Sequence, residues 1–274
     1  MNDENNKSIS NGPQGAPDDD LYIFEDTTSA GTPMDPIRRI ISIFIAPGKL
    51  IENIKEFPRF VTAIIAILIL SLISAAAAMM ILPIVANSQS IAIAERYGVD
   101  FLNYTQVTEQ VLSQSFGFAF IISWIGAAIG VLVAAIWGAI VIKVITLIMK
   151  GNATFKQYFS LVIHTSIITL LGGVVASLLM LMTDSAMVFT SPAPIFMPNG
   201  NFLSPLFNLL SSIEIFGIWS MLVLAIGVKK FNDGFSTGKA VAAAAVYYAL
   251  SVGFAAAVTS LAMLSYDFTY NMMH

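Results

Sequence analysis

The sequence predicts an all-α membrane protein, a bundle of five transmembrane helices preceded by amphipathic helices in the cytoplasmic interface. Three observations predict this class. Hydrophobic residues make up 57% of the chain and charged residues only 11%. The mean hydropathy is +0.79, which excludes a single soluble core. Five apolar segments are each long enough to cross ~30 Å of hydrocarbon at ~1.5 Å per residue.

The five predicted spans differ in how sharply they are bounded. They lie near residues 60–85, 118–142, 159–182, 209–228 and 239–264. The second belongs to a longer apolar stretch that reaches Met149, so we expect its helix to tilt or to project beyond the membrane. After the fifth span, residues 265–274 are expected to form a short outer tail.

Residues 1–34 differ in composition from the rest of the chain. They are rich in Asn, Asp, Gly, Ser and Pro, and six of the 17 acidic residues lie within the first 25 positions. Such a segment is expected to be a disordered, acidic cytoplasmic tail. It lacks the basic start and apolar core of a secretory signal, so we expect the first span to be retained as an anchor. The apolar run at 21–24 is either a docking motif or an incidental patch.

A helical period begins after this tail, over residues 35–57. Apolar residues recur on one face in two pieces separated by Pro47 and Gly48, while Arg38 and Arg39 fall elsewhere. At roughly 10 residues each, the pieces are too short to span a bilayer. They are expected either to lie in the interface, with their basic residues near lipid phosphates, or to pack beneath the bundle.

The basic residues predict an orientation. Of the 13 lysines and arginines, only Arg96 falls on the side opposite to the other twelve when five spans alternate across the membrane. The positive-inside rule then places the amino terminus in the cytoplasm and the carboxyl terminus outside.

Small residues at intervals of four predict how one helix packs. Gly126, Gly130, Ala134 and Gly138 form a stripe on the second span, which allows a close approach of another helix. We expect this stripe to pack within the chain. Association of two copies through the same faces is the alternative.

Polar side chains within the spans are few, and each is a candidate functional residue. Lys143 is expected to snorkel to the interface. His164, about one turn inside the third span, is expected to hydrogen-bond a neighbouring carbonyl or to relay protons. Glu214, five residues before Trp219, is expected to begin the fourth helix, favoured by its dipole, to bind a cation or proton, or to hold the outer loop in place.

The two outer connections are expected to contrast with each other. Residues 185–206 contain four prolines and a turn at Asn199–Asn201, and are expected to lie across the membrane surface or to dip into the bundle. Residues 87–115 are more polar and are expected to be a helical cap with a break at Tyr97 and Gly98.

Several kinds of chemistry are missing from the sequence. The chain has no cysteine and only two histidines, and it contains no phosphate-binding loop, zinc-protease or serine-hydrolase motif. We therefore expect a protein that is not an enzyme and that uses no cofactor or metal. Its expected partners are the lipid bilayer and other membrane proteins, not nucleic acid.

Four short motifs occur in order along the chain: Ile45 to Pro58, Lys150 to Tyr158, Glu214 to Gly227 and Gly238 to Ala240. Together they resemble the Yip (Ypt/Rab-interacting protein) domain family of five-span membrane proteins. The resemblance draws attention to Gly151, Thr154 and Phe155 in the connection before the third span. Within that span, His164 and its neighbours stand where the family often has a tyrosine and, after small residues, a proline.

The resemblance covers about residues 35–264 and implies a five-span fold. Eukaryotic members of the family are linked to small GTPases and vesicle traffic, whereas prokaryotic members mostly have no assigned activity. The tail shows no trafficking motif, so we expect a prokaryotic member in the plasma membrane. Three functional classes remain: a membrane scaffold or accessory subunit, a transporter or channel, and a membrane-shaping or lipid-interacting protein.

Overall fold

The computed structural model describes residues 32–97, 101–188, 190–198 and 204–273 of the 274-residue chain. Residues 34–274 form one compact unit. The tail predicted for residues 1–34, with its apolar run, lies almost entirely outside the described residues. Among those that are described, every regular element is a helix, so the predicted all-α membrane class is confirmed.

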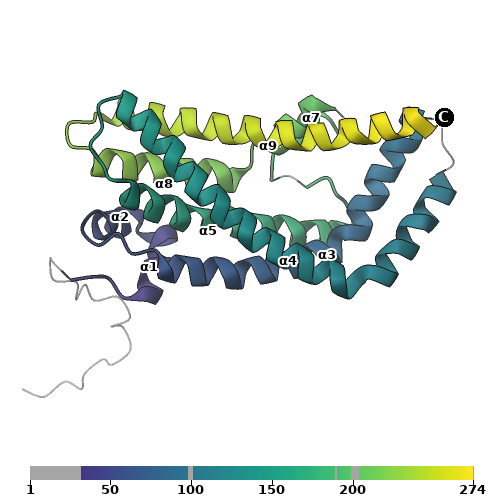
Figure 1. Cartoon of the computed structure of the whole chain (residues 1–274), viewed down its shortest axis with the longest axis horizontal. Helices are drawn as coiled ribbons and strands as arrows, with labels where there is room; N and C mark the ends of the chain where they lie inside the picture. Colours follow the sequence, from purple (N-terminus) through teal and green to yellow (C-terminus); the bar gives the residue numbers. More distant parts are fainter. Residues whose placement is uncertain (1–31, 98–100, 189, 199–203, 274) are drawn as a thin grey trace, which may run out of the picture. The chain divides into compact units, whose positions relative to one another are not determined.

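The long helices run side by side, and α1 and α2 lie at one end of them (Figure 1). The elements are α1 Pro36–Ile45, α2 Pro47–Glu56, α3 Val61–Tyr97, α4 Phe101–Ile148, α5 Phe155–Thr183, α6 Ala193–Phe196, α7 Pro205–Ser211, α8 Ile215–Phe231 and α9 Thr237–Met273. The α4–α5 and α8–α9 connections lie at the same end as α2, which we call the α2 end.

In the part of the chain that the structure describes, four helices are each long and apolar enough to cross a membrane, within residues 61–89, 120–148, 155–183 and 237–261. A fifth crossing requires α7 and α8 together, which meet at an angle of 57°. The fourth span therefore differs from the continuous helix predicted over 209–228. The chain is extended at Glu214, and the Ile215 amide donates to the carbonyl of Thr190 instead of to a preceding helical turn.

The helix ends also differ from the predicted span boundaries. α3 continues to Tyr97 and α4 begins at Phe101, so the described residues of the predicted cap are helical, Tyr97 included. Gly98 itself is outside the described residues. α9 extends to Met273, so the residues expected to form a short outer tail from residue 265 continue the last helix beyond its apolar window at 237–261.

α5 is the central helix. It packs against α3, α4 and α8, and it also contacts α1 and α2. Its inner side chains, such as Leu161 and Ile163, are fully buried. A Cβ on Gly227 of α8 would overlap the side chain of Leu161, so only glycine allows α8 to approach α5 this closely.

The small-residue stripe of α4 is divided between two environments. A Cβ on Gly138 would lie 2.5 Å from the Tyr247 hydroxyl oxygen, so this glycine packs within the chain as predicted. Gly126, Gly130 and Ala134 are exposed, and a Cβ on either glycine would meet nothing within 4 Å. Packing within the chain is therefore wrong for these two glycines, because α4 presents them outward.

The two short helices each have an apolar face against the bundle. Leu50, Ile51 and Ile54 of α2 are fully buried, while its charged residues Glu52, Lys55 and Glu56 are exposed. α2 thus packs beneath the bundle. α1 has two apolar faces, because Ile43 is buried whereas Ile37, Ile41 and Ile45 are 43–69% exposed.

The proline-rich connection between α5 and α8 packs partly on the bundle. α5 ends at Thr183, and Asp184 follows in the left-handed conformation, with φ of 48°. Val188 and Ala193 are buried, whereas Phe196 is 71% exposed. The predicted turn at residues 199–201 lies outside the described residues.

Candidate functional site

Arg39 is the charged side chain that the fold buries most deeply. It is 1% exposed, although Arg38 beside it on α1 is only partly buried. The prediction that Arg39 lies near lipid phosphates is therefore wrong, because the inward face of α1 carries it into the protein. Burial, and to a lesser extent the charge of Arg59, lowers the pKa of Arg39 to about 10, so it stays protonated at neutral pH.

The guanidinium of Arg39 joins three segments of the chain. Nη1 donates to Oδ1 of Asn53 on α2 at 2.9 Å and to the carbonyl of Phe57 at 3.3 Å. Nη2 donates to the carbonyl of Arg59, just before α3, at 2.9 Å. These acceptors are neutral and point in different directions, which suits the planar fork of arginine better than a lysine ammonium.

α5 is connected to the same segment. The hydroxyl of Ser160 donates to the carbonyl of Arg59 at 2.9 Å, so this oxygen accepts from both Ser160 and Arg39. The side-chain amide of Gln157 donates to the carbonyl of Lys55 at 2.9 Å. The residues that lead from α2 into α3 are thus held from one side by α1 and from the other by α5.

His164 lies one turn beyond Ser160 and is fully buried. Its Nδ1 is 2.6 Å from the carbonyl oxygen of Ser160, and because a carbonyl only accepts, Nδ1 is the protonated nitrogen. Nε2 is buried without a hydrogen-bond partner, and the ring is within electrostatic reach of Arg39. Of the two roles predicted for His164, the structure shows the hydrogen bond to a neighbouring carbonyl.

The connection between α4 and α5 is built around a side chain that the sequence analysis missed. Asn232, at the end of α8, is 1% exposed. Its Oδ1 accepts from the Ala153 amide at 3.0 Å, and its Nδ2 donates to the Tyr158 hydroxyl and the Val228 carbonyl, each at 2.7 Å. The only signal in the sequence is an amide shortly after the span predicted at 209–228, a position that more often faces water.

Gly151 is required by this contact. A Cβ there would lie 2.5 Å from Oδ1 of Asn232 and 2.9 Å from the carbonyl of Thr146. Thr154 begins α5 with a capping box, in which its hydroxyl accepts from the Gln157 amide while the Gln157 side chain accepts from the Thr154 amide. Gly151 and Thr154 therefore have structural roles in positioning α5 against α8.

Phe155 is 44% exposed and begins a row of aromatic rings. Its ring stacks on Phe159 at 6.0 Å between centroids, and Phe159 meets Phe60 edge to face at 4.9 Å. This row connects the start of α5 to the start of α3. Close by, Lys143 of α4 donates to the carbonyl of Ala153, so it turns toward the α4–α5 connection.

Ion pairs also hold α2 in place at the α2 end. Lys230 of α8 pairs with Glu52 of α2 and also donates to the carbonyl of Gly48 at 3.1 Å. Lys55 of α2 pairs with Asp233 in the α8–α9 connection at 3.1 Å. Both pairs are partly exposed, so each contributes little to stability by itself. Together they fix where α2 sits across the end of α8.

Glu214 and Trp219 are not part of this cluster. Glu214 is the N-terminal cap residue of α8, so it begins that helix, although its side chain makes no capping hydrogen bond. The 17 residues of α8 separate it from Asn232 by roughly 25 Å. Trp219 is 45% exposed on the side of α8 that faces an apolar groove.

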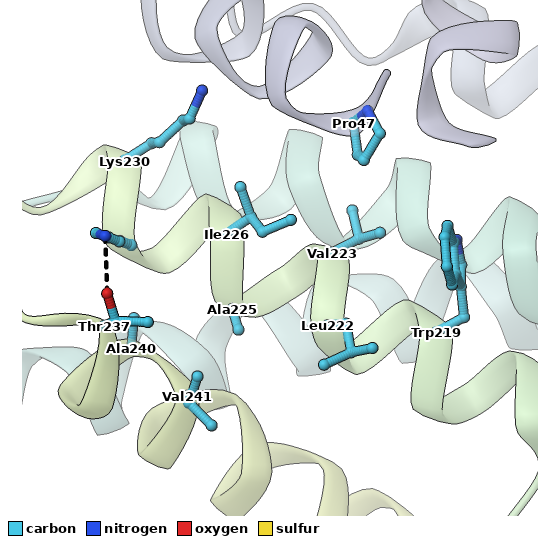
Figure 2. A pocket seen from close by; sticks show the side chains of 11 residues that line it. Pro47, Trp219, Leu222, Val223, Ala225, Ile226, Lys230, Thr237, Ala240 and Val241 are labelled. Carbon is cyan, nitrogen blue, oxygen red and sulfur yellow. Dashed lines mark hydrogen bonds between the residues drawn. The ribbon is translucent and has the colours of Figure 1, made fainter. Parts of the chain in front are cut away.

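This groove lies between α8 and α9, with Pro47 of α2 at its edge (Figure 2). Its volume is about 690 Å³. Leu222, Ile226 and Val241 line its apolar part, and Lys229 and Thr237 lie at the α2 end. Among the residues that the structure describes, no group of three His, Asp or Glu side chains is close enough to hold a metal ion.

Replacing Arg39 by lysine should destabilise the protein, because one ammonium cannot reach all three acceptors. Each hydrogen bond lost from the charged guanidinium is expected to cost about 1.5–3 kcal/mol. The matched control is Arg38→Lys, which changes the neighbouring, less buried arginine in the same way. Thermal unfolding of the detergent-solubilised chain should show a lower midpoint for Arg39→Lys and little change for Arg38→Lys. Equal midpoints for the two variants would contradict this role of Arg39.

Comparison with known proteins agrees with the resemblance seen in the motifs. The sequence model of the Yip1 domain matches residues 41–259. The chain is similar to membrane protein YknW of Bacillus subtilis (strain 168), with 33% identity over 107 residues. That alignment covers 38% of this chain and 45% of YknW, so it spans less than half of either protein. No solved structure matches the chain. Because the Yip1 match covers most of the sequence, the chain belongs to the Yip1 domain family, and it is a multi-pass integral membrane protein.

Proposed function

We propose that the chain is a non-enzymatic membrane scaffold or accessory subunit that binds another membrane protein through the outward face of α4. The observation that carries the proposal is the exposed position of Gly126 and Gly130. A Cβ at either position would meet open space, whereas at Gly138 on the same helix it would meet Tyr247. One part of the stripe is used within the chain and the other is open to a partner.

The physics of helix association in lipid supports this assignment. Apolar side chains gain little from leaving lipid for another apolar surface, so close backbone packing drives association. Gly126, Gly130 and Ala134 permit such an approach. The exposed side chains of Ile129 and Trp137 lie beside them on α4 and supply surface for packing on the partner.

Capture of partners with the full chain tests the proposal. In mild detergent, the wild type should retain a membrane protein in stoichiometric amount, and Gly126→Leu with Gly130→Leu should reduce its recovery about tenfold or more, because leucine keeps the backbones apart. Gly253→Leu is the matched control, since Gly253 of α9 is also exposed with nothing within 4 Å of an added Cβ. Its partner recovery should equal that of the wild type.

Two results would contradict a scaffold role for this face. One is recovery of the wild-type chain alone in several detergents. The other is a partner whose recovery is the same for the double glycine variant and for Gly253→Leu. Co-purification of two differently tagged copies, lost in the double variant, would identify the partner as a second copy of the chain.

We further infer that the α2 end faces the cytoplasm of a prokaryotic cell and that the carboxyl terminus lies outside. Support comes from the clustering of lysines at this end, including Lys55, Lys150 and Lys230, since cytoplasmic loops of membrane proteins are enriched in basic residues. Asp184 lies beyond the other end of α5.

Labelling of single cysteines tests this orientation, and the chain has no native cysteine to interfere. An impermeant maleimide added to intact cells should label Asp184→Cys and should label Lys156→Cys only after permeabilisation. The reverse pattern would overturn the orientation. Labelling of both positions in intact cells would contradict a crossing by α5.

A further inference from the structure

The groove between α8 and α9 has the shape of a binding site. It is formed by 11 residues from three helices, α2, α8 and α9 (Figure 2). These are Pro47, Trp219, Leu222, Val223, Ala225, Ile226, Lys229, Lys230, Thr237, Ala240 and Val241. Its volume of about 690 Å³ falls within the range of ~300–1,000 Å³ that is typical of small-molecule sites. None of its lining residues is acidic.

The polarity of the groove changes along its length. From Trp219 through Leu222 to Ile226 its wall on α8 is apolar, and Val241 faces it from α9 (Figure 2). Toward the α2 end, the wall on α8 continues with two lysines, Lys229 and Lys230. The helix rises ~15 Å from Trp219 to Lys229, which is about half of the ~30 Å hydrocarbon core. The apolar wall thus has the depth of one lipid leaflet and ends in basic residues.

The two lysines differ in what they contact. Lys230 is engaged by Glu52 and by the carbonyl of Gly48. Lys229 donates to the hydroxyl of Thr237 at 2.8 Å, and it makes no ion pair with any acid among the residues described. The basic end of the groove therefore combines a cation and a neutral hydroxyl, a pairing that complements a phosphate monoanion.

We propose that the groove binds one anionic glycerophospholipid from the leaflet on the side of the α2 end. An acyl chain lies along Leu222, Ile226 and Val241, and the phosphate lies against Lys229 and Thr237. A zwitterionic lipid fits the apolar part equally well, but its own cationic headgroup reduces the attraction to Lys229. The binding is independent of the scaffold face, because no residue of α4 lines the groove.

The fluorescence of Trp219 can report whether the groove is occupied, because Trp219 lines the groove and the chain has only three tryptophans. With Trp124 and Trp137 replaced by phenylalanine, the full chain is reconstituted in phosphatidylcholine vesicles. Phosphatidylglycerol or phosphatidylcholine with brominated acyl chains is then added at equal mole fractions. Brominated phosphatidylglycerol should reach half-maximal quenching of Trp219 at a mole fraction about fivefold lower, as expected for one basic residue near an anionic headgroup.

Three variants of the protein that keeps only Trp219 test what causes the preference for the anionic lipid. Lys229→Gln should abolish it, whereas Lys156→Gln should keep it, because Lys156 lies at the same end of the bundle but does not line the groove. Ile226→Phe should weaken quenching by both lipids, because the larger ring occupies the path of the acyl chain. Gel filtration checks that each variant is folded.

Two outcomes would overturn the proposal. Equal quenching of the parent protein by the two brominated lipids would show that the groove does not select an anionic headgroup. A preference that survives in folded Lys229→Gln, or that Lys156→Gln removes equally, would show that general surface charge causes it. Neither outcome bears on partner capture by α4, so the two proposals fail separately.

Discussion

The guanidinium of Arg39 is a buried charge whose hydrogen bonds fix the entry of the chain into the bundle. A charge in the protein interior is costly unless its donors are paired, and in Arg39 both Nη atoms are paired whereas the buried Nε has no partner among the described residues. Here the acceptors are Asn53 and the carbonyls of Phe57 and Arg59, which belong to α2 and to the segment before α3. These two carbonyls need a donor because the backbone between the two helices is irregular, so that they accept no helical hydrogen bond.

Other contacts at the α2 end depend on the position that Arg39 gives to this segment. Ser160 shares the carbonyl of Arg59, which sets α5 beside α3. Asn232 then joins the end of α8 to the start of α5 through Ala153 and Tyr158. α2 is held across α8 by Lys230 and Glu52. A row of polar contacts thus determines the relative position of helices whose apolar surfaces alone would pack in several ways.

Hydropathy predicted the helical class and the approximate places of the five spans, because length and apolar content suffice for that. It did not predict the break before α8. The chain bends there because Ile215 bonds to Thr190, a tertiary contact that no local pattern encodes. The apolar windows in α3 and α9 end at residues 89 and 261, before the helices end at Tyr97 and Met273, so hydropathy marks the spans and not the full helices.

The candidate site was predicted in part. Gly151, Thr154 and His164 were recognised, but their structural contacts depend on partners distant in sequence. The helical period places Arg38 and Arg39 together outside the apolar face. Which of the two arginines is buried depends on how α1 is rotated about its axis, and the sequence does not give that rotation. Asn232 was missed, because a single amide after a helix gives no signal until Tyr158 and Ala153 are placed beside it. Likewise, the four-residue spacing of the small residues in α4 does not show which of its glycines face outward.

The central claim is that Arg39 holds the segment from α2 to the start of α3 against the bundle. Hydrogen–deuterium exchange of the full chain in nanodiscs tests it most directly, comparing wild type with Arg39→Met, which keeps the apolar bulk and removes the donors. The account predicts faster exchange in residues 47–60 and unchanged exchange in residues 237–261 of α9, because only the former contain the acceptors of Arg39. Unchanged exchange in residues 47–60, or an equal increase throughout the chain, would contradict it.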